Sequence, residues 1–535
     1  MAIPDIFKQR AQSENWDLND AATLTANKTI EADVIIIGTG AGGGVSAEVL
    51  SQAGLKVVMI EEGGLHTSDD FNMDELEALP NLYQEGGTRS TKDGAINILQ
   101  GRAVGGTTVV NWTSSFRTPA STLNHWKKEH GVSGFSPEEM KPYFEKMEQR
   151  LNVEKWAMAP NSNNDILKRG CEKNNWSWSV IPRNVSGCWD LGYCGTGCPT
   201  NAKQSMLVTT VPEALKNGSS LYYRCSADKL VFSEHKVESV ECIAIGKDGK
   251  TPTGIKLSFR AKHIVLSGGA INNPGLLLRS KAPDPHNLIG KRTTIHPVNI
   301  NLATMPDTVN PFYGAPQSIY SDHFQWPDND EMGFKLEVPP IQPVMGGQIA
   351  GFHGVKLTET MKNLPNLQGT LALMRDGFHE QSQGGTVELD STGKPILDYP
   401  ITDYLWKALR KAHHVMAELQ FAAGAKEVKP LHLDAEFYKS LAECKTAIDT
   451  LPQELFRQRI MTAHLMGGCI MGGDEQSSVI NSQGQFRHAD NLTIIDGSAF
   501  PTSIGANPQL SIYALALKQS SELANFLTGK LAVSA

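Results

Sequence analysis

The sequence has no long uninterrupted hydrophobic segment, no long basic run, no internal repeat and no low-complexity tract. No window approaches about 18 consecutive apolar residues, so we expect no transmembrane helix. The first twenty residues are polar and lack the apolar core of a signal peptide. A net charge of −8 without a basic patch argues against nucleic acid as a partner. We therefore expect a cytoplasmic protein, and the sequence leaves open peripheral association with a membrane or export with a signal-bearing partner subunit.

What the sequence does contain is the composition of a folded protein of 535 residues, with 40% hydrophobic and 20% charged residues. We predict a polar N-terminal arm over residues 1–30 and two domains whose sequences interleave. The first, an α/β domain, comprises residues 31–130, 199–300 and 456–530. The second comprises residues 131–198 and 301–455, where extended segments such as GTVELDSTGKPILDYPI precede a helical stretch.

A dinucleotide-binding βαβ unit is predicted from ADVIIIGTGAGGGVSAEVLSQAGLKVVMIEEGG. Gly38, Gly40 and Gly43 form G-x-G-x-x-G after a buried strand, and Ala41 lies where the helix begins. The helix N-terminus offers free N–H groups to a pyrophosphate. Glu61 ends the second strand, where a carboxylate can accept hydrogen bonds from ribose hydroxyls. This unit alone does not distinguish FAD from NAD.

Further blocks follow in order along the chain. They are GRAVGGTTVVNW, GGAINNPGLLLRS, TIHP around His296, AHLMGGC around His464, and IIDGSAFP followed by GANPQLSIYALAL. With the βαβ unit, they resemble the glucose–methanol–choline (GMC) oxidoreductases, which are FAD-dependent alcohol-oxidising enzymes. The resemblance covers nearly the whole chain after residue 31, and it is closer to the cholesterol-oxidase and long-chain-alcohol branches than to glucose oxidase.

The resemblance implies the GMC fold, in which a Rossmann-like FAD-binding domain is interleaved with an antiparallel-sheet substrate-binding domain. It implies that the FAD site includes residues from the glycine-rich turn and from the C-terminal segment. These are Gly105, Gly106, Thr107, Asn111, Asp496, Gly497 and Pro508. Some relatives attach FAD through a histidine near GRAVGGTTVVNW, but this chain has none between Ile98 and Asn124. We therefore expect FAD to be bound non-covalently.

Two residues are expected to act on the alcohol. Oxidation removes a hydroxyl proton and passes a hydride to the flavin, and a neutral imidazole suits the proton-accepting role. By their position in the family motifs, His464 is the expected general base and Asn507 the donor that holds the substrate oxygen. The alternative is that His464 is an ordinary core histidine and Asn507 a loop cap. His296 also matches a family position, but the sequence assigns it no role in the chemistry, and it is not among the expected catalytic residues.

A cysteine-rich loop, CWDLGYCGTGCPTNAKQS, carries Cys188, Cys194 and Cys198 in the pattern C-x5-C-x3-C-P. The spacing is similar to that in catalytic subunits of bacterial FAD-dependent glucose dehydrogenases, where it implies a three-iron, four-sulfur cluster. Long-chain-alcohol oxidases carry a similar segment without an established cluster. Iron–sulfur ligands and packed thiols therefore both stay open, with zinc or a disulfide as further alternatives.

The function that we predict is FAD-dependent dehydrogenation of a bulky or apolar alcohol, with electrons passed to a quinone, a cytochrome or another acceptor. The alternatives are an oxidase that reduces oxygen to hydrogen peroxide, and a sugar or polyol dehydrogenase. More remote hypotheses are a hydroxynitrile lyase on the same fold and a non-catalytic flavin-binding protein.

Overall fold

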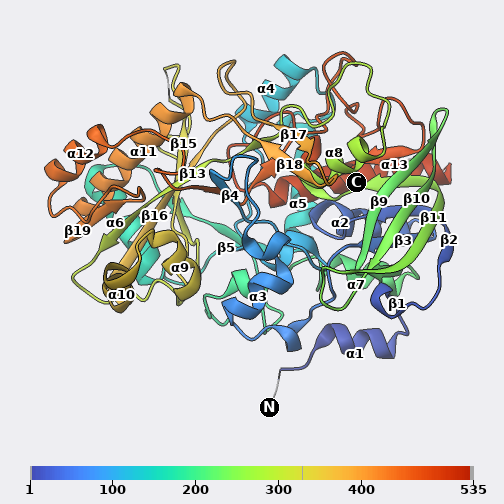
Figure 1. The fold of residues 1–535 in the computed structure, drawn as a ribbon, viewed down its shortest axis with the longest axis horizontal. Helices are drawn as coiled ribbons and strands as arrows, with labels where there is room; N and C mark the ends of the chain where they lie inside the picture. Colours follow the sequence, from blue (N-terminus) through green and yellow to red (C-terminus); the bar gives the residue numbers. More distant parts are fainter. Residues whose placement is uncertain (1–2, 328, 530–535) are drawn as a thin grey trace.

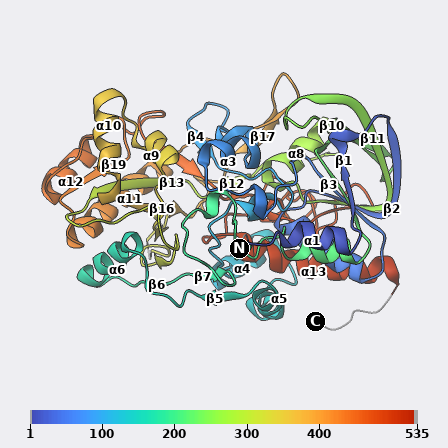
Figure 2. The same cartoon turned by 90° about the horizontal axis from the view of Figure 1, so that it is seen from below.

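The chain folds around two large sheets, seen at opposite ends of the molecule in Figures 1 and 2. The structure is a computed structural model and describes residues 3–327 and 329–529. The first sheet has the strand order β1-β8-β3-β2-β11-β10-β9, with β22 paired to β11. Its strands are β1 (Asp17–Asp20), β2 (Lys28–Ile37), β3 (Val57–Glu61), β8 (Ser220–Tyr223), β9 (Cys225–Ser233), β10 (Lys236–Ile245), β11 (Pro252–Leu266) and β22 (Leu492–Ile494).

The centre of this sheet is parallel and buried. β2 pairs in parallel with β3 and β11, and β22 pairs in parallel with β11. Every residue of β3 is buried, because helices cover a parallel sheet on its faces. The helix that follows β2, α2 (Ala41–Gln52), packs against the C-terminal helix α13 (Gln509–Thr528). The start of α2 is thereby set at the carboxyl end of the central strands.

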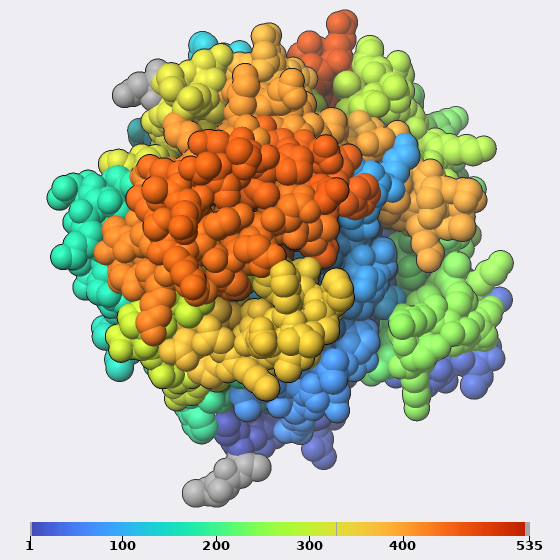
Figure 3. All heavy atoms as spheres, turned by 60° about the vertical axis from the view of Figure 1, so that its left-hand side comes forward, coloured from blue at the N-terminus to red at the C-terminus, as the bar shows by residue number. Residues whose placement is uncertain are grey.

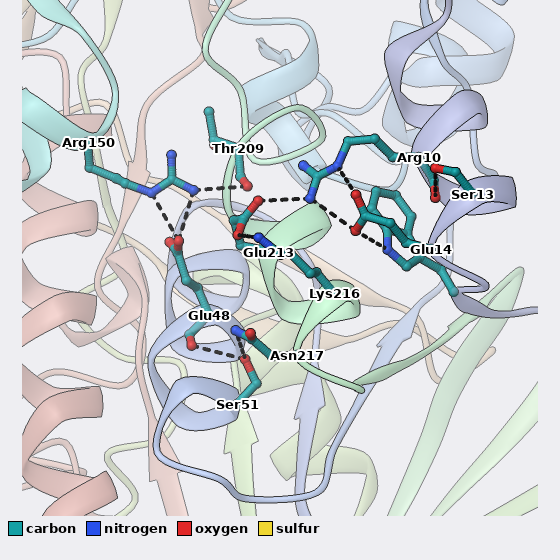
Figure 4. Close-up of polar contacts among 11 residues, drawn as sticks. Arg10, Ser13, Glu14, Glu48, Ser51, Arg150, Thr209, Glu213, Lys216 and Asn217 are labelled. Carbon is teal, nitrogen blue, oxygen red and sulfur yellow. Dashed lines mark hydrogen bonds and ion pairs between the residues drawn. The ribbon is translucent and has the colours of Figure 1, made fainter.

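A network of charged groups also holds α2 in place (Figure 4). Arg150 donates two hydrogen bonds to Glu48 Oε1, at 3.0 and 2.8 Å, and a third to the carbonyl of Thr209. Arg10 binds Glu213 at 2.9 Å. Burial raises the pKa of Glu48, and the neighbouring guanidinium opposes that shift. The network joins α2 to α1 (Ile6–Ser13), α5 (Pro137–Arg150) and α7 (Thr210–Lys216).

The second sheet has the order β4-β20-β13-β16-β15-β14-β6, with β19 paired to β13. Except for the parallel pair of β4 and β20, its strands pair antiparallel. The long helix α11 (Asp403–Ala422) packs on β13 and β16. The strands are β4 (Ile96–Ile98), β6 (Ser179–Val180), β13 (Val298–Thr304), β14 (Ile319–Ser321), β15 (Phe334–Glu337), β16 (Leu367–Met374), β19 (Glu427–Pro430) and β20 (Ile460–Thr462).

Shorter elements connect and cover the two sheets. The helices are α3 (Glu75–Leu82), α4 (Ala120–His130), α6 (Ser162–Asn174), α8 (Gly269–Arg279), α9 (Pro343–Ala350), α10 (Gly354–Lys362) and α12 (Leu441–Thr450). The paired short strands are β5 (Val153–Lys155) with β7 (Pro182–Asn184), β12 (Thr294–Ile295) with β21 (Leu465–Met466), and β17 (Thr386–Leu389) with β18 (Pro395–Asp398). In the space-filling view, α9 and α10 lie between the segment around α12 and the segment around α3 (Figure 3).

The architecture confirms the expected α/β fold, with one mixed, largely parallel sheet and one sheet that is antiparallel except for the pair of β4 and β20. The segments alternate between the sheets along the chain, but they do not follow the predicted boundaries everywhere. Residues 1–30 contain β1, which pairs with β8, and Phe7 and Trp16 are buried in the core. β4 joins the second sheet although it lies within residues 31–130. Within residues 3–327 and 329–529, no helix is both long and apolar enough to cross a membrane.

Candidate active site

A cavity of about 870 Å³ runs between the two sheets. At one end it is lined by the start of α2 and the ends of β2 and β3, and at the other by β13, β16 and the 461–465 segment. Most of the predicted cofactor residues line it, namely Gly38, Gly40, Ala41, Glu61, Gly106, Thr107, Asn111, Asp496, Gly497 and Pro508. Gly43 and Gly105 are not part of the lining. The sequence motifs therefore converge on one cavity.

The glycines of the βαβ unit allow backbones to approach each other. Gly38 has φ +96°, and a Cβ there would lie 2.4 Å from the carbonyl oxygen of Ser267. A Cβ on Gly43 would lie 1.9 Å from the oxygen of Gly38, so this glycine lets α2 pack on its own turn. A Cβ on Gly106 would lie 2.7 Å from the Cα of Gly40, so the two glycine-rich segments touch. Gly106 therefore has no room for a side chain at this meeting point, whereas a Cβ on Gly40 would meet Gly106 at an ordinary contact distance of 3.7 Å.

Glu61 is held by protein donors at the end of β3. Its Oε2 accepts hydrogen bonds from the N–H and hydroxyl of Thr39, at 3.1 and 2.8 Å, and its Oε1 accepts one from the N–H of Gly63 at 3.0 Å. Burial raises the pKa of the carboxyl. A carboxylate has about four acceptor sites, so these three bonds leave room for one hydroxyl donor from the cavity.

Asp496 joins the C-terminal segment to the start of α8. Its Oδ2 accepts from the N–H of Gly269 at 2.7 Å and from Asn273 Nδ2 at 2.8 Å, and its Oδ1 accepts from the N–H of Ser498 at 2.8 Å. Burial raises the pKa of this carboxyl as well. Its main structural effect is to fix the turn at Gly497, which lines the cavity.

His464 and Asn507 both line the other part of the cavity. The short pair of β12 and β21 places Ile295 opposite Leu465, which brings His296 beside His464. The Nδ1 atoms of these two rings lie 2.9 Å apart. His296 Nε2 accepts a hydrogen bond from the backbone N–H of Gly505 at 3.2 Å. Burial lowers the pKa of both imidazoles, to about 3 for His464, so both are neutral near pH 7.

Asn507 is oriented by a buried carboxylate. Its Nδ2 donates to Glu337 Oε2 at 3.2 Å, and its Oδ1 has no hydrogen-bond partner within the described part of the chain. Glu337 lies 3.9 Å from Lys335 Nζ, which packs against the rings of Phe116 and Tyr320. Burial lowers the pKa of Lys335 to about 8 and raises that of Glu337. Sequence reasoning missed Glu337 and Lys335, because neither belongs to a recognisable motif.

The wall beyond His464 is apolar. Val298 and Ile300 on β13 and Leu371 and Leu373 on β16 face the cavity. The alternate residues of β13 point the other way, and Asn299 donates to a carbonyl of α11. This separation follows from the two-residue period of a strand. The remaining apolar lining includes Pro339, Pro340, Met345, Ile349 and Met461.

The three loop cysteines do not form a metal site in this structure. Cys188 Sγ lies 4.0 Å from Asp190, Cys194 Sγ lies 3.8 Å from Arg183, and Cys198 accepts from the N–H of Lys203 at 3.5 Å. Across residues 3–327 and 329–529, no three His, Cys, Asp or Glu side chains gather as a metal would require. The contacts recorded for the three thiols are with protein groups, and the structure gives no support for a cluster held by them.

Lys203 is a buried residue of this loop that sequence reasoning also missed. Its Nζ donates to the carbonyls of Val109, Asn111 and Cys194, each at 2.7 Å. Burial lowers its pKa to about 8. The ammonium thereby ties the cysteine-rich loop to the segment that carries Asn111 into the cavity.

Comparison with known proteins relates this chain to a family of enzymes. The N-terminal model of the GMC oxidoreductases matches residues 79–298, and the C-terminal model matches residues 380–516. The chain is 30% identical over 532 residues to the long-chain-alcohol oxidase FAO4B of Arabidopsis thaliana, covering 94% of this chain and 69% of that protein. An uncharacterised GMC-type oxidoreductase of Mycobacterium tuberculosis is 30% identical, with 91% of this chain and 75% of that protein covered.

The fold is also similar to that of solved structures. Formate oxidase from Aspergillus oryzae superposes with a TM-score of 0.70 at 14% identity, covering 94% of this chain and 99% of the other. At this identity the likeness supports the fold alone.

Proposed function

Because the chain belongs to the GMC oxidoreductase family and is an FAD-dependent enzyme that acts on CH–OH groups, we propose that it oxidises a bulky or long-chain apolar alcohol to the aldehyde or ketone. The observation that carries the proposal is the apolar wall of β13 and β16, which continues from His464. A sugar would bring many hydroxyl groups to this wall, where they would lose hydrogen bonds to water.

The glycine-lined end of the cavity fits a bound FAD. Gly40 and Gly106 both line this end, a Cβ on Gly40 would meet only Gly106 Cα, at 3.7 Å, and the N-terminus of α2 can receive the pyrophosphate. Glu61 retains acceptor capacity for a ribose hydroxyl. We propose that FAD is bound non-covalently. When bound, it accepts the hydride from the alcohol carbon.

We propose that His464 and Asn507 bind the alcohol oxygen. His464 has its Nδ1 occupied by His296, which leaves Nε2 for the substrate. Its neutral imidazole is the proposed acceptor of the hydroxyl proton. Asn507 has given one N–H to Glu337, and its second N–H is the proposed donor to the substrate oxygen.

The electron acceptor separates two candidate functions. The first is a dehydrogenase that passes electrons to a quinone or cytochrome. The second is an oxidase that uses oxygen, and it is favoured by the names of relatives such as FAO4B. Peroxide formed stoichiometrically during turnover in air would establish the oxidase, and its absence would favour the dehydrogenase.

Anaerobic bleaching of the flavin by alcohols tests the reaction itself. Long-chain primary alcohols should bleach the holoprotein faster than short alcohols or glucose. His464→Gln should slow bleaching about 10²- to 10⁴-fold, the contribution of a general base. The matched control is His414→Gln on α11, whose ring contacts Asp449 and does not line the cavity. Unchanged bleaching in His464→Gln, or bleaching by glucose alone, would refute the proposal.

A further inference from the structure

Three groups form a hydrogen-bonded chain that ends at the cavity. The N–H of Gly505 donates to His296 Nε2 at 3.2 Å, and His296 Nδ1 lies 2.9 Å from His464 Nδ1. His464 Nε2 is the ring nitrogen that these contacts leave free. Both rings come from segments far apart in sequence, and the pairing of β12 with β21 holds them together.

The donor at one end of this chain decides where every proton lies. A backbone N–H can only donate, so His296 Nε2 must present its lone pair. A neutral imidazole carries one ring proton, so that of His296 is on Nδ1. It points at His464 Nδ1, which must then accept. The one ring proton of His464 is left on Nε2, at the cavity.

We propose that His296 is a positioning residue that, together with the Gly505 amide, holds His464 in the tautomer protonated on Nε2. The resting site therefore presents an N–H donor to the substrate oxygen, where the motif alone suggests a lone pair. The inference deepens the proposed function, on which it rests for the identity of the substrate group.

The assignment changes how His464 can act as a base. Its Nε2 has a lone pair only in the opposite tautomer, with the proton on Nδ1. His296 must then carry its own proton on Nε2, facing the N–H of Gly505. In this tautomer the hydrogen bond from Gly505 to His296 is lost, and two N–H donors face each other. The tautomer is therefore less populated, on the order of ten- to a hundredfold.

Proton transfer then proceeds from this minor tautomer. The hydroxyl O–H bond breaks, an N–H bond forms at His464 Nε2, and the electron pair stays on the substrate oxygen. The resting tautomer has a separate use, because its Nε2–H binds the hydroxyl oxygen before the reaction.

Nitrogen-15 solid-state NMR of the FAD-bound protein, labelled only at histidine, tests the assignment. The chain has 15 histidines, but among the described residues no other two imidazole rings are hydrogen-bonded to each other. A nitrogen–nitrogen coupling across that bond identifies the pair without a variant. We expect His464 to be protonated on Nε2 and His296 on Nδ1. A proton on His464 Nδ1, or equal occupancy of both sites, would overturn the proposal.

Two substitutions test whether His296 causes the bias. His296→Leu removes the donor, and the proton of His464 should then distribute over both ring nitrogens. His296→Gln can again donate an amide N–H toward His464 Nδ1 and should restore the Nε2 tautomer. Equal spectra for the two variants would refute the role of His296. If neither variant folds, the wild-type spectrum still decides the tautomer, and neither measurement depends on turnover.

Discussion

The contact between Gly40 and Gly106 should affect the affinity for FAD more than the backbone conformation of either residue does. In Gly106→Ala the new Cβ would lie 2.7 Å from Gly40 Cα, whereas carbon atoms pack at about 3.5–4.0 Å. The segments must separate by roughly 1 Å, at a cost typical of overpacking, about 1–3 kcal/mol. The residue also has φ +57°, which costs an alanine about 1–2 kcal/mol more.

Gly54→Ala separates these two costs. Gly54 also has positive φ, at +85°, but a Cβ there meets nothing within 4 Å. Only the backbone cost remains. We expect the dissociation constant for FAD to be about 5- to 150-fold higher in Gly106→Ala than in the control, the equivalent of about 1–3 kcal/mol. Gly106→Ala should therefore release FAD on a correspondingly smaller dilution. Flavin fluorescence of the diluted holoprotein measures the release, and thermal unfolding measures the common backbone cost. Equal FAD affinity in the two variants would refute the contact argument.

Three further outcomes are expected. Ile300→Trp should raise KM for long-chain alcohols at least tenfold and leave short alcohols unaffected in anaerobic bleaching; an equal rise for both would contradict the role of the apolar wall. Burial lowers the pKa of His263 to about 4, so as the pH falls below about 6.5 the unfolded state binds a proton before the folded state does. About 3 kcal/mol of the free energy of unfolding should therefore be lost between pH 6.5 and 4. Urea unfolding of His263→Gln should show a smaller loss over this range, and the same pH dependence in wild type and variant would contradict this. Protein purified without air should contain no stoichiometric iron bound by Cys188, Cys194 and Cys198, and a cluster signal in electron paramagnetic resonance would show that the loop rearranges.

The dinucleotide site was predictable because its determinants are local. Gly38, Gly40 and Gly43 lie within six residues, and their spacing reflects one turn between a strand and a helix. The hydrophobic run of β2 likewise indicates a buried parallel strand without further information. His464 and Asn507 were found through the family resemblance, and the structure places both at the cavity.

The groups that orient these residues were not predictable in the same way. Glu337 lies on a strand of the second sheet, 170 positions before the Asn507 that it binds. Lys203 reads as a charged loop residue, yet it is buried beneath carbonyls almost a hundred positions away. The N-terminal segment reads as a polar arm because Phe7 and Trp16 are isolated apolar residues, and only the pairing of β1 with β8 shows that they join the core.

The two histidines show why a residue type in a motif does not define its chemistry. An imidazole at position 464 can be a base or a donor, and its surroundings decide which form is populated. Here the decision comes from His296, 168 positions away, and from the Gly505 amide, 209 positions from His296. Both partners are set by the pairing of β12 and β21 and by the turn before Asn507. The role of the catalytic histidine is therefore a property of the tertiary fold, and a proton assignment made from the motif alone would place the lone pair on the wrong nitrogen.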